Sequence, residues 1–127
     1  MRSHSRFREH NGLWAAEAIQ GMARKNRKRM IEGIVSALKA YDPERVYLFG
    51  SWARGEADRL SDIDLVIVKD TQAGFFHRLK EAAACLPEDW GPVDVLVYTP
   101  DELRRMEEEG NAFVEMLLEE GELIYEK

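Results

Sequence analysis

Apolar and polar residues alternate along the chain in blocks that predict short strands and helices. Apolar runs rich in β-branched and aromatic residues predict three strands, at residues 45–49, 62–69 and 93–98. Apolar stripes at helical spacing predict helices over residues 13–40, 73–86, 99–109 and 111–120, and a short helix from residue 51 toward residue 56. A short edge strand is expected at residues 123–125. Helices must cover the sheet, so the order α-β-α-β-α-β-α-α-β predicts a two-layer α/β or α+β domain.

Local signals place the ends and the buried faces of several helices. Asp42-Pro43 ends the first helix, because a proline restricts the residue before it. Thr99, Pro100 and Glu102 form a helix start with an N-cap, a proline at the first helical position and a capping box. In the helix over residues 73–86, six residues are expected to face the core: Phe75, Phe76, Leu79, Ala82, Ala83 and Leu86.

The composition is that of one globular domain. Of 127 residues, 45% are hydrophobic and 33% are charged, which is enough apolar material for the core of a soluble protein. Residues 1–12 are polar and unpatterned, so we expect a mobile tail followed by a single domain at residues 13–127. No apolar run approaches the roughly 20 residues of a membrane span. Cys85 is the only cysteine, which excludes an intrachain disulfide and fits a reducing cytoplasm.

The net charge of −6 hides an asymmetry between the two parts of the chain. Residues 1–45 hold ten Lys and Arg against five Asp and Glu, whereas residues 46–127 hold eight against nineteen. The overall acidity argues against general nucleic-acid binding. The basic run Arg24–Arg29 is either a solvated helix face or a surface for RNA or an acidic partner.

The stretch from Val46 to Val68 carries the candidate chemistry. It predicts a strand, a turn and a second strand, with Gly50-Ser51 ending the first strand. Because side chains alternate along a strand, Asp62 and Asp64 point the same way, and the apolar residues beside them point to the other face. Two carboxylates on one face repel each other, and a buried charge needs a partner or a metal. A divalent cation between them meets both needs; alternatively, Asp62 only caps the strand entry.

The spacing of these residues resembles the signature of the nucleotidyltransferase superfamily, whose fold DNA polymerase beta and kanamycin nucleotidyltransferase share. That pattern is Gly-Ser, about ten residues, then Asp-x-Asp; here ten residues separate Ser51 from Asp62. The pair Arg54-Gly55 and the ending Ser61–Leu65 look most like the minimal nucleotidyltransferases, short proteins often paired with a HEPN-domain partner in toxin–antitoxin modules. The resemblance covers less than half of the chain directly and implies a mixed sheet.

The resemblance implies transfer of AMP from ATP to a hydroxyl, supported by two Mg²⁺ ions. Asp62 and Asp64 would bridge both ions. Asp94, the one carboxylate in the third predicted strand, would ligate the ion that activates the acceptor and can take the acceptor's proton. These three aspartates are therefore the predicted catalytic and metal-binding residues, although Asp94 is alternatively a strand-edge carboxylate.

The resemblance also places the ATP phosphates at the turn after the first strand. Gly50 lets the backbone approach a phosphate closely, and Ser51 offers a hydroxyl at a helix N-terminus, where free N–H groups favour anions. Arg54, one turn further on, can reach the same phosphates. Its alternative is a structural ion pair with Asp58 or Glu56.

Three functions remain open from the sequence. In the first, the chain transfers AMP to an acceptor, by resemblance a HEPN-type toxin, and acts as its antitoxin. In the second, it is a non-catalytic antitoxin that neutralises a HEPN ribonuclease by binding it. In the third, it modifies nucleic acid, which only the basic run supports. The chain has no room for an acceptor-binding domain, so we expect a partner protein or a homo-oligomer, contacted partly by Phe113, Met116 and Leu117.

Overall fold

The computed structural model describes residues 27–54, 62–88 and 93–127. The chain divides into two compact units, Met1–Ile31 and Glu32–Lys127. In the first unit, the described residues 27–31 are helical. The tail predicted at residues 1–12 lies outside the described ranges, so its boundary stays a prediction. No helix in the described ranges is long and apolar enough to cross a membrane.

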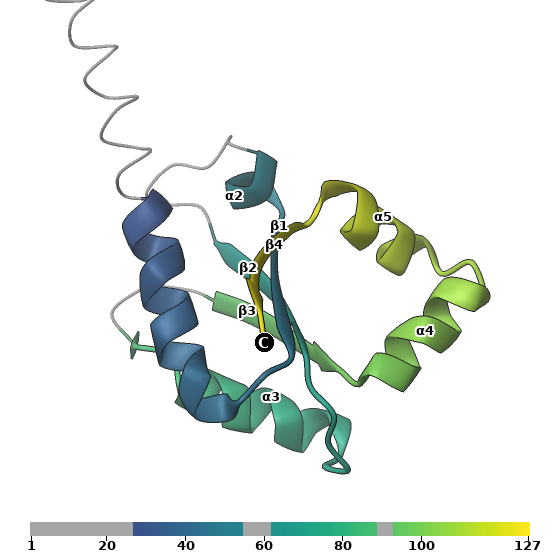
Figure 1. The fold of residues 1–127 in the computed structure, drawn as a ribbon, viewed down its shortest axis with the longest axis horizontal. Coiled ribbons are helices and arrows are strands. Elements are labelled where there is room, and N and C mark those ends of the chain that lie inside the picture. Colours follow the sequence, from purple (N-terminus) through teal and green to yellow (C-terminus); the bar gives the residue numbers. More distant parts are fainter. Residues whose placement is uncertain (1–26, 55–61, 89–92) are drawn as a thin grey trace, which may run out of the picture. The chain divides into compact units, whose positions relative to one another are not determined.

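The secondary structure elements follow the predicted order (Figure 1). The first helix is described over residues 27–38. The strands are β1 (Arg45–Phe49), β2 (Ile63–Val68), β3 (Val93–Tyr98) and β4 (Glu122–Glu126). The remaining helices are η1 (Lys39–Tyr41), α2 (Ser51–Arg54), α3 (Phe75–Ala84), α4 (Pro100–Glu108) and α5 (Ala112–Glu120). The bounds of β1 and β3 are those that the apolar runs predicted.

A four-stranded sheet in the order β3-β2-β1-β4 forms the centre of the second unit. β1 pairs antiparallel with β2 and with β4, whereas β2 and β3 run parallel. α3 lies in the crossover connection that a parallel pair requires. The mixed sheet and its helical cover confirm the predicted α/β (α+β) fold.

Helices cover both faces of the central strand β2. Its apolar residues are buried alternately, Ile63, Leu65 and Ile67 on one face and Val66 and Val68 on the other. In Figure 1, α4 and α5 lie on one side of the sheet, and α3 and residues 32–38 of the first helix lie on the other. A strand that is buried on both faces requires a nearly continuous apolar sequence, which explains why Asp64 is the single charge in β2.

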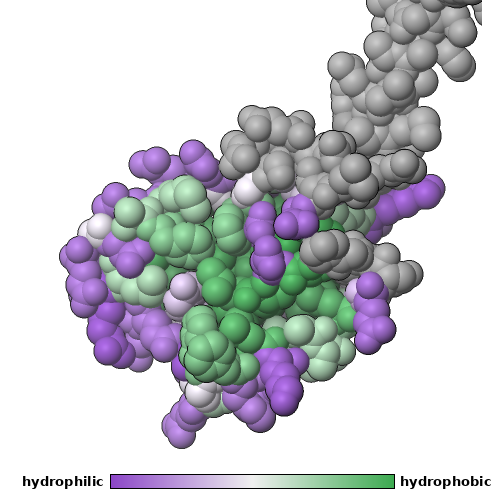
Figure 2. Space-filling view, turned by 180° about the vertical axis from the view of Figure 1, so that it is seen from behind, coloured by the Kyte–Doolittle hydropathy of each residue, from purple (hydrophilic) through white to green (hydrophobic). Residues whose placement is uncertain are grey.

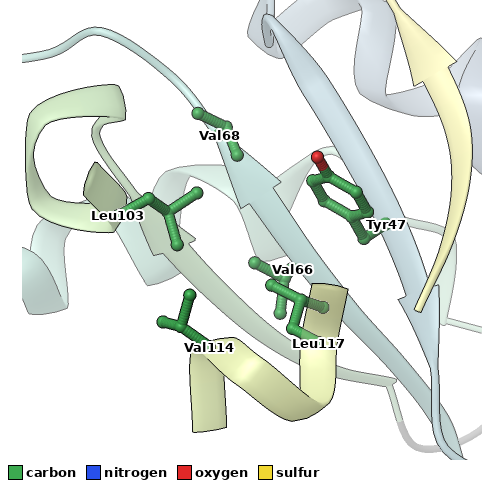
Figure 3. Packing of buried hydrophobic residues seen from close by; sticks show 6 residues of the cluster. All are labelled: Tyr47, Val66, Val68, Leu103, Val114 and Leu117. Atoms are coloured by element: carbon green, nitrogen blue, oxygen red, sulfur yellow. The ribbon is translucent and has the colours of Figure 1, made fainter. Parts of the chain in front are cut away.

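The core beneath α4 and α5 is a cluster of six buried residues, shown in Figure 3: Tyr47, Val66, Val68, Leu103, Val114 and Leu117. Leu117 is fully buried in it, so it is not one of the apolar residues of α5 that are left for a partner. Val114 and Leu117 are three positions apart and lie on one face of α5, which faces the sheet. Met116 and Leu118 are 37% and 50% exposed and form the outer side of the helix.

Side-chain caps set the starts of α4 and α5. The Thr99 hydroxyl accepts a hydrogen bond from the Glu102 N–H at 3.1 Å, and Glu102 Oε1 accepts one from the Thr99 N–H at 2.8 Å. This reciprocal pair confirms the predicted capping box. At α5, Asn111 Oδ1 accepts from the N–H groups of Phe113 at 3.0 Å and Val114 at 3.1 Å. These caps satisfy N–H groups that a helix start otherwise leaves unpaired.

α3 turns a different face to the core from the one predicted. Of the six residues expected there, Ala82 is buried, Leu79 and Leu86 are half-buried, and Phe75, Phe76 and Ala83 are exposed. Phe76 is 81% exposed, whereas Arg78 is only 7% exposed. Positions two apart on a helix point in nearly opposite directions, so burying Arg78 turns Phe76 outward.

Arg78 is buried because its guanidinium has partners in β3, in α4 and in the loop before α3. It donates to the carbonyl of Ala73 at 2.7 Å, to the carbonyl of Val97 at 3.4 Å and to Glu102 Oε1 at 2.7 Å. A buried charge is tolerated only when it is paired and hydrogen-bonded. The apolar pattern of α3 could not indicate this, because Val97 and Glu102 are supplied by β3 and α4.

Candidate active site

The three predicted catalytic aspartates lie at the same end of β2 and β3. Asp62 immediately precedes β2, Asp64 is its second residue, and Asp94 is the second residue of β3. Asp64 and Asp94 are register partners in the parallel pair. Register partners on neighbouring strands, about 4.8 Å apart, carry their side chains on the same face. The structure therefore places Asp64 of β2 beside Asp94 of β3, as the sequence predicted.

The turn after β1 meets the same carboxylate group. Gly50 has a φ of 77°, in the left-handed region that favours glycine. A Cβ at Gly50 would lie 2.5 Å from Oδ2 and 3.4 Å from Cγ of Asp64. The position thus requires glycine for two reasons, its backbone conformation and the Asp64 carboxylate that occupies the side-chain space. Antiparallel pairing produces this contact, because Phe49 at the end of β1 is the register partner of Asp64.

The two other predicted phosphate ligands follow directly. Ser51 and Arg54 are the first and last residues of α2, the short helix that begins after Gly50 and packs against β1 and β2. Their side chains lie outside what the structure describes, as do Glu56 and Asp58, the alternative partners of Arg54. Their roles stay predictions, and only the backbone path from Gly50 into a helix start is established.

The three aspartates suit a hard cation, but the described residues do not form a complete metal site by themselves. Asp62 and Asp94 are exposed and Asp64 is half-buried. Among the described residues, no three His, Cys, Asp or Glu side chains form a group that could hold a metal ion. Mg²⁺ prefers oxygen ligands and is usually bound through one or two carboxylates together with substrate phosphates. Adjoining carboxylates next to the Gly50 turn, the predicted phosphate site, fit that mode of binding.

Comparison with protein families decides the assignment. The family model described as "Polymerase beta, Nucleotidyltransferase" matches residues 32–127, which include the turn, β2 and β3. This chain belongs to that nucleotidyltransferase family. The match begins where the second compact unit begins, so the family fold is the unit that carries the aspartates.

Two solved structures resemble this nucleotidyltransferase. One is a "putative nucleotidyltransferase" from Sulfolobus solfataricus, with 25% identity, a TM-score of 0.57, and coverage of 83% of this chain and 87% of the other. The second is described as a toxin-antitoxin with AMP-PNP, with 20% identity, a TM-score of 0.50, and coverage of 76% and 73%. At that identity the second likeness shows the fold alone. No curated protein matches the chain.

Sequence reasoning missed one neighbour of the candidate site. Phe49 pairs with Asp64 across the sheet, and its ring packs edge-on against Phe113 of α5 with centroids 5.7 Å apart. The sequence indicated only that Phe49 ends a strand. Its place directly before Gly50 was the available signal, but the contact with Asp64 depends on the register of β1 against β2.

Proposed function

We propose that this nucleotidyltransferase transfers AMP from ATP to a hydroxyl group of a partner protein. The observation that supports this most directly is the packing of the Gly50 turn against Asp64, which is in register with Asp94. A transfer reaction needs the phosphates and the acceptor held at one place in a defined orientation. The Gly50 turn, where we propose that the phosphates bind, lies at the same end of the sheet as the carboxylates of Asp64 and Asp94. These residues can therefore hold the phosphates and the acceptor at one place.

Each residue has a separate task in this proposal. The backbone at Gly50, with Ser51 and Arg54, binds the distal phosphates of ATP. Asp62, Asp64 and Asp94 hold two Mg²⁺ ions, which when bound neutralise the charge of the triphosphate and of the leaving pyrophosphate. Asp94 accepts the proton of the acceptor hydroxyl. The acceptor oxygen then bonds to the α-phosphorus, and the electron pair of the breaking bond leaves with pyrophosphate.

We propose further that the acceptor is a tyrosine of a HEPN-type toxin and that the chain is its antitoxin. The likeness to a structure described as a toxin-antitoxin with AMP-PNP is consistent with this at the level of fold. A tyrosine hydroxyl has a pKa near 10, so it needs a carboxylate or a metal to lose its proton at neutral pH. A bulky anion added near a ribonuclease site would repel RNA phosphates.

A non-catalytic antitoxin is the second candidate. It is favoured by the apolar side chains that the described part leaves on its surface, above all Phe76 at 81% exposure, because exposed apolar patches mark protein interfaces. Modification of nucleic acid has weaker support. Its only basis is the basic run Arg24–Arg29, while residues 46–127 are strongly acidic.

Mass spectrometry of a co-expressed partner separates the first two candidates. The protein encoded beside this chain is produced together with the wild type or with Asp94→Asn. The enzyme proposal expects mass additions in units of AMP with the wild type and none with Asp94→Asn. If the wild type and Asp94→Asn inhibit the partner equally and neither adds mass to it, the non-catalytic antitoxin is established instead.

A further inference from the structure

Five aromatic rings form a continuous row across the second unit. In order along the row they are Phe49, Phe113, Tyr98, Phe75 and Phe76, which come from β1, α5, β3 and α3. Successive ring centroids are 5.7, 6.5, 6.3 and 5.5 Å apart. These separations lie within the range in which aromatic pairs attract each other. We call these five residues the aromatic row.

The row joins the candidate active site to an exposed surface. At one end, Phe49 directly precedes Gly50 and is the register partner of Asp64. At the other end, Phe75 and Phe76 are 38% and 81% exposed. Tyr98, in the middle, lies on the same strand as Asp94, four positions further along, and therefore on the same face of the sheet.

The exposed end of the row borders a hollow. Phe75, Tyr98 and Met106 supply the apolar part of its lining, and Glu102, Arg105 and Glu109 supply the charged part; its volume is about 260 Å³. Figure 2 shows apolar residues over much of one face of the described part, with hydrophilic residues mostly around them and a few among them. A large apolar area with a polar rim is typical of an interaction site.

The charges around the row restrict what can bind there. Residues 99–127, which supply α4, α5 and β4, hold ten Asp and Glu against three Lys and Arg, whereas α3 holds two basic residues and one Glu. Nucleic acid is unsuitable, because its phosphates would meet carboxylates. A second copy of this chain is also unsuitable, because it would bring two acidic surfaces together. A protein segment with apolar side chains flanked by Lys or Arg is complementary in both respects.

We propose that the aromatic row is the docking surface for the acceptor protein, which binds it through an apolar segment flanked by basic residues. This inference rests on the proposed function, which requires an acceptor close to Asp94. The hollow receives an apolar side chain of the segment, and the exposed ring of Phe76, which packs against Phe75, contacts a second one. Glu109 pairs with a basic side chain beside it. The other three rings, Tyr98, Phe113 and Phe49, are partly buried against the core cluster and connect the docked end of the row with the Gly50 turn.

Selection from random peptides tests the docking surface without knowledge of the partner. A phage-displayed library of dodecapeptides is panned on the wild type alone. The enriched peptides should combine apolar residues with Lys or Arg. By fluorescence anisotropy, the best peptide should lose about tenfold or more in affinity with Phe76→Ala, the loss typical of an exposed aromatic anchor. Glu109→Lys should weaken the same peptide, because it reverses the charge that the basic residues meet.

The matched control is Leu118→Ala. Leu118 is 50% exposed but lines a different hollow, with Arg45 and Leu103, so its loss should leave peptide affinity unchanged. Any of four results would overturn the proposal: no enriched peptide, equal affinity for wild type and Phe76→Ala, oligouridylate binding that Phe76→Ala removes, or a dimer in size-exclusion chromatography that Phe76→Ala dissociates. Phe76 is almost fully exposed, so its replacement should not prevent folding.

One further variant separates this proposal from the proposed function. Asp94→Asn should bind the selected peptide as tightly as the wild type, because Asp94 lies outside the aromatic row. If the row binds peptides but no AMP transfer occurs with the wild type, the enzymatic function fails and the docking surface stands. If transfer to the partner occurs equally with the wild type and with Phe76→Ala, the docking surface fails and the enzymatic function stands.

Discussion

The Asp64 carboxylate occupies the space that a side chain at Gly50 would need, with Oδ2 2.5 Å from that Cβ position. The Gly50 turn and the Asp64 carboxylate therefore pack directly against each other. This relationship ties the turn after β1 to the aspartate pair of β2 and β3, and it explains why a glycine must stand there whatever is bound.

Gly50→Ala should displace the Asp64 carboxylate and abolish binding of Mg²⁺–ATP, as measured by calorimetry. The left-handed backbone should also lower stability by about 1–2 kcal/mol. Gly110→Ala is the matched control, because Gly110 has a φ of 71° but its nearest neighbour to a Cβ is 3.9 Å away. Both variants should lose similar stability in urea titrations, and only Gly50→Ala should lose the ligand. Equal ligand binding by both would show that the Asp64 contact is unimportant.

Asp94→Asn should abolish AMP transfer, retain most ATP binding and slightly stabilise the unliganded protein. Asp94 and Asp64 are register partners, and like charges on adjoining strands are unfavourable, by about 0.2–1 kcal/mol. Thermal unfolding at low ionic strength measures the gain. Asp70→Asn, at an exposed position after β2, is the control and should leave both transfer and stability unchanged. A destabilised Asp94→Asn would contradict the repulsion argument.

The Arg78–Glu102 pair should make stability depend on pH in a predictable direction. Partial burial raises the pKa of Glu102, but the hydrogen bonds from Arg78 and from the Thr99 N–H outweigh it and leave the pKa below its usual value of 4.5. A lowered folded pKa contributes stability that is fully present above the unfolded value and is lost as the pH falls through the folded value. Glu102→Gln should therefore lower the free energy of unfolding at pH 7, and the loss relative to the wild type should become smaller toward pH 3.

The expected loss at pH 7 for Glu102→Gln is about 1 kcal/mol, because the Glu102 side chain is 37% exposed and solvent weakens the pair. Urea titrations of the wild type and the variant at both pH values measure it. Glu120→Gln, at an exposed position of α5, serves as the comparison for a generic loss of charge. A constant difference between wild type and Glu102→Gln across the range would exclude the linkage.

Leu117→Ala and Leu118→Ala should differ strongly although the residues are neighbours. Leu117 is fully buried in the cluster beneath α5, so its truncation should cost about 2–5 kcal/mol. Leu118 is half exposed and should cost clearly less. Chemical denaturation of both variants measures the difference. Similar losses would mean that α5 packs on the sheet through a different face.

The sequence by itself determined the elements, because their signals are local. Apolar alternation placed β1 and β3, and Thr99 with Glu102 placed the start of α4. The Gly50-Ser51 turn and the Asp62-x-Asp64 pair were identified because their spacing resembles the nucleotidyltransferase signature, and the family match agrees with that identification. Their roles in binding and catalysis stay predictions, since spacing identifies a motif and not a measured activity.

Tertiary structure alone decided which residues meet. The contact of Gly50 with Asp64 depends on antiparallel register, and the place of Asp94 beside Asp64 depends on parallel register. Helical periodicity placed Phe76 in the core, yet Phe76 is exposed because α3 buries Arg78 on its opposite face, and two partners of Arg78 come from two other elements. A local pattern records the preference of each residue for water or core, but it contains no information about distant partners that make a buried charge stable.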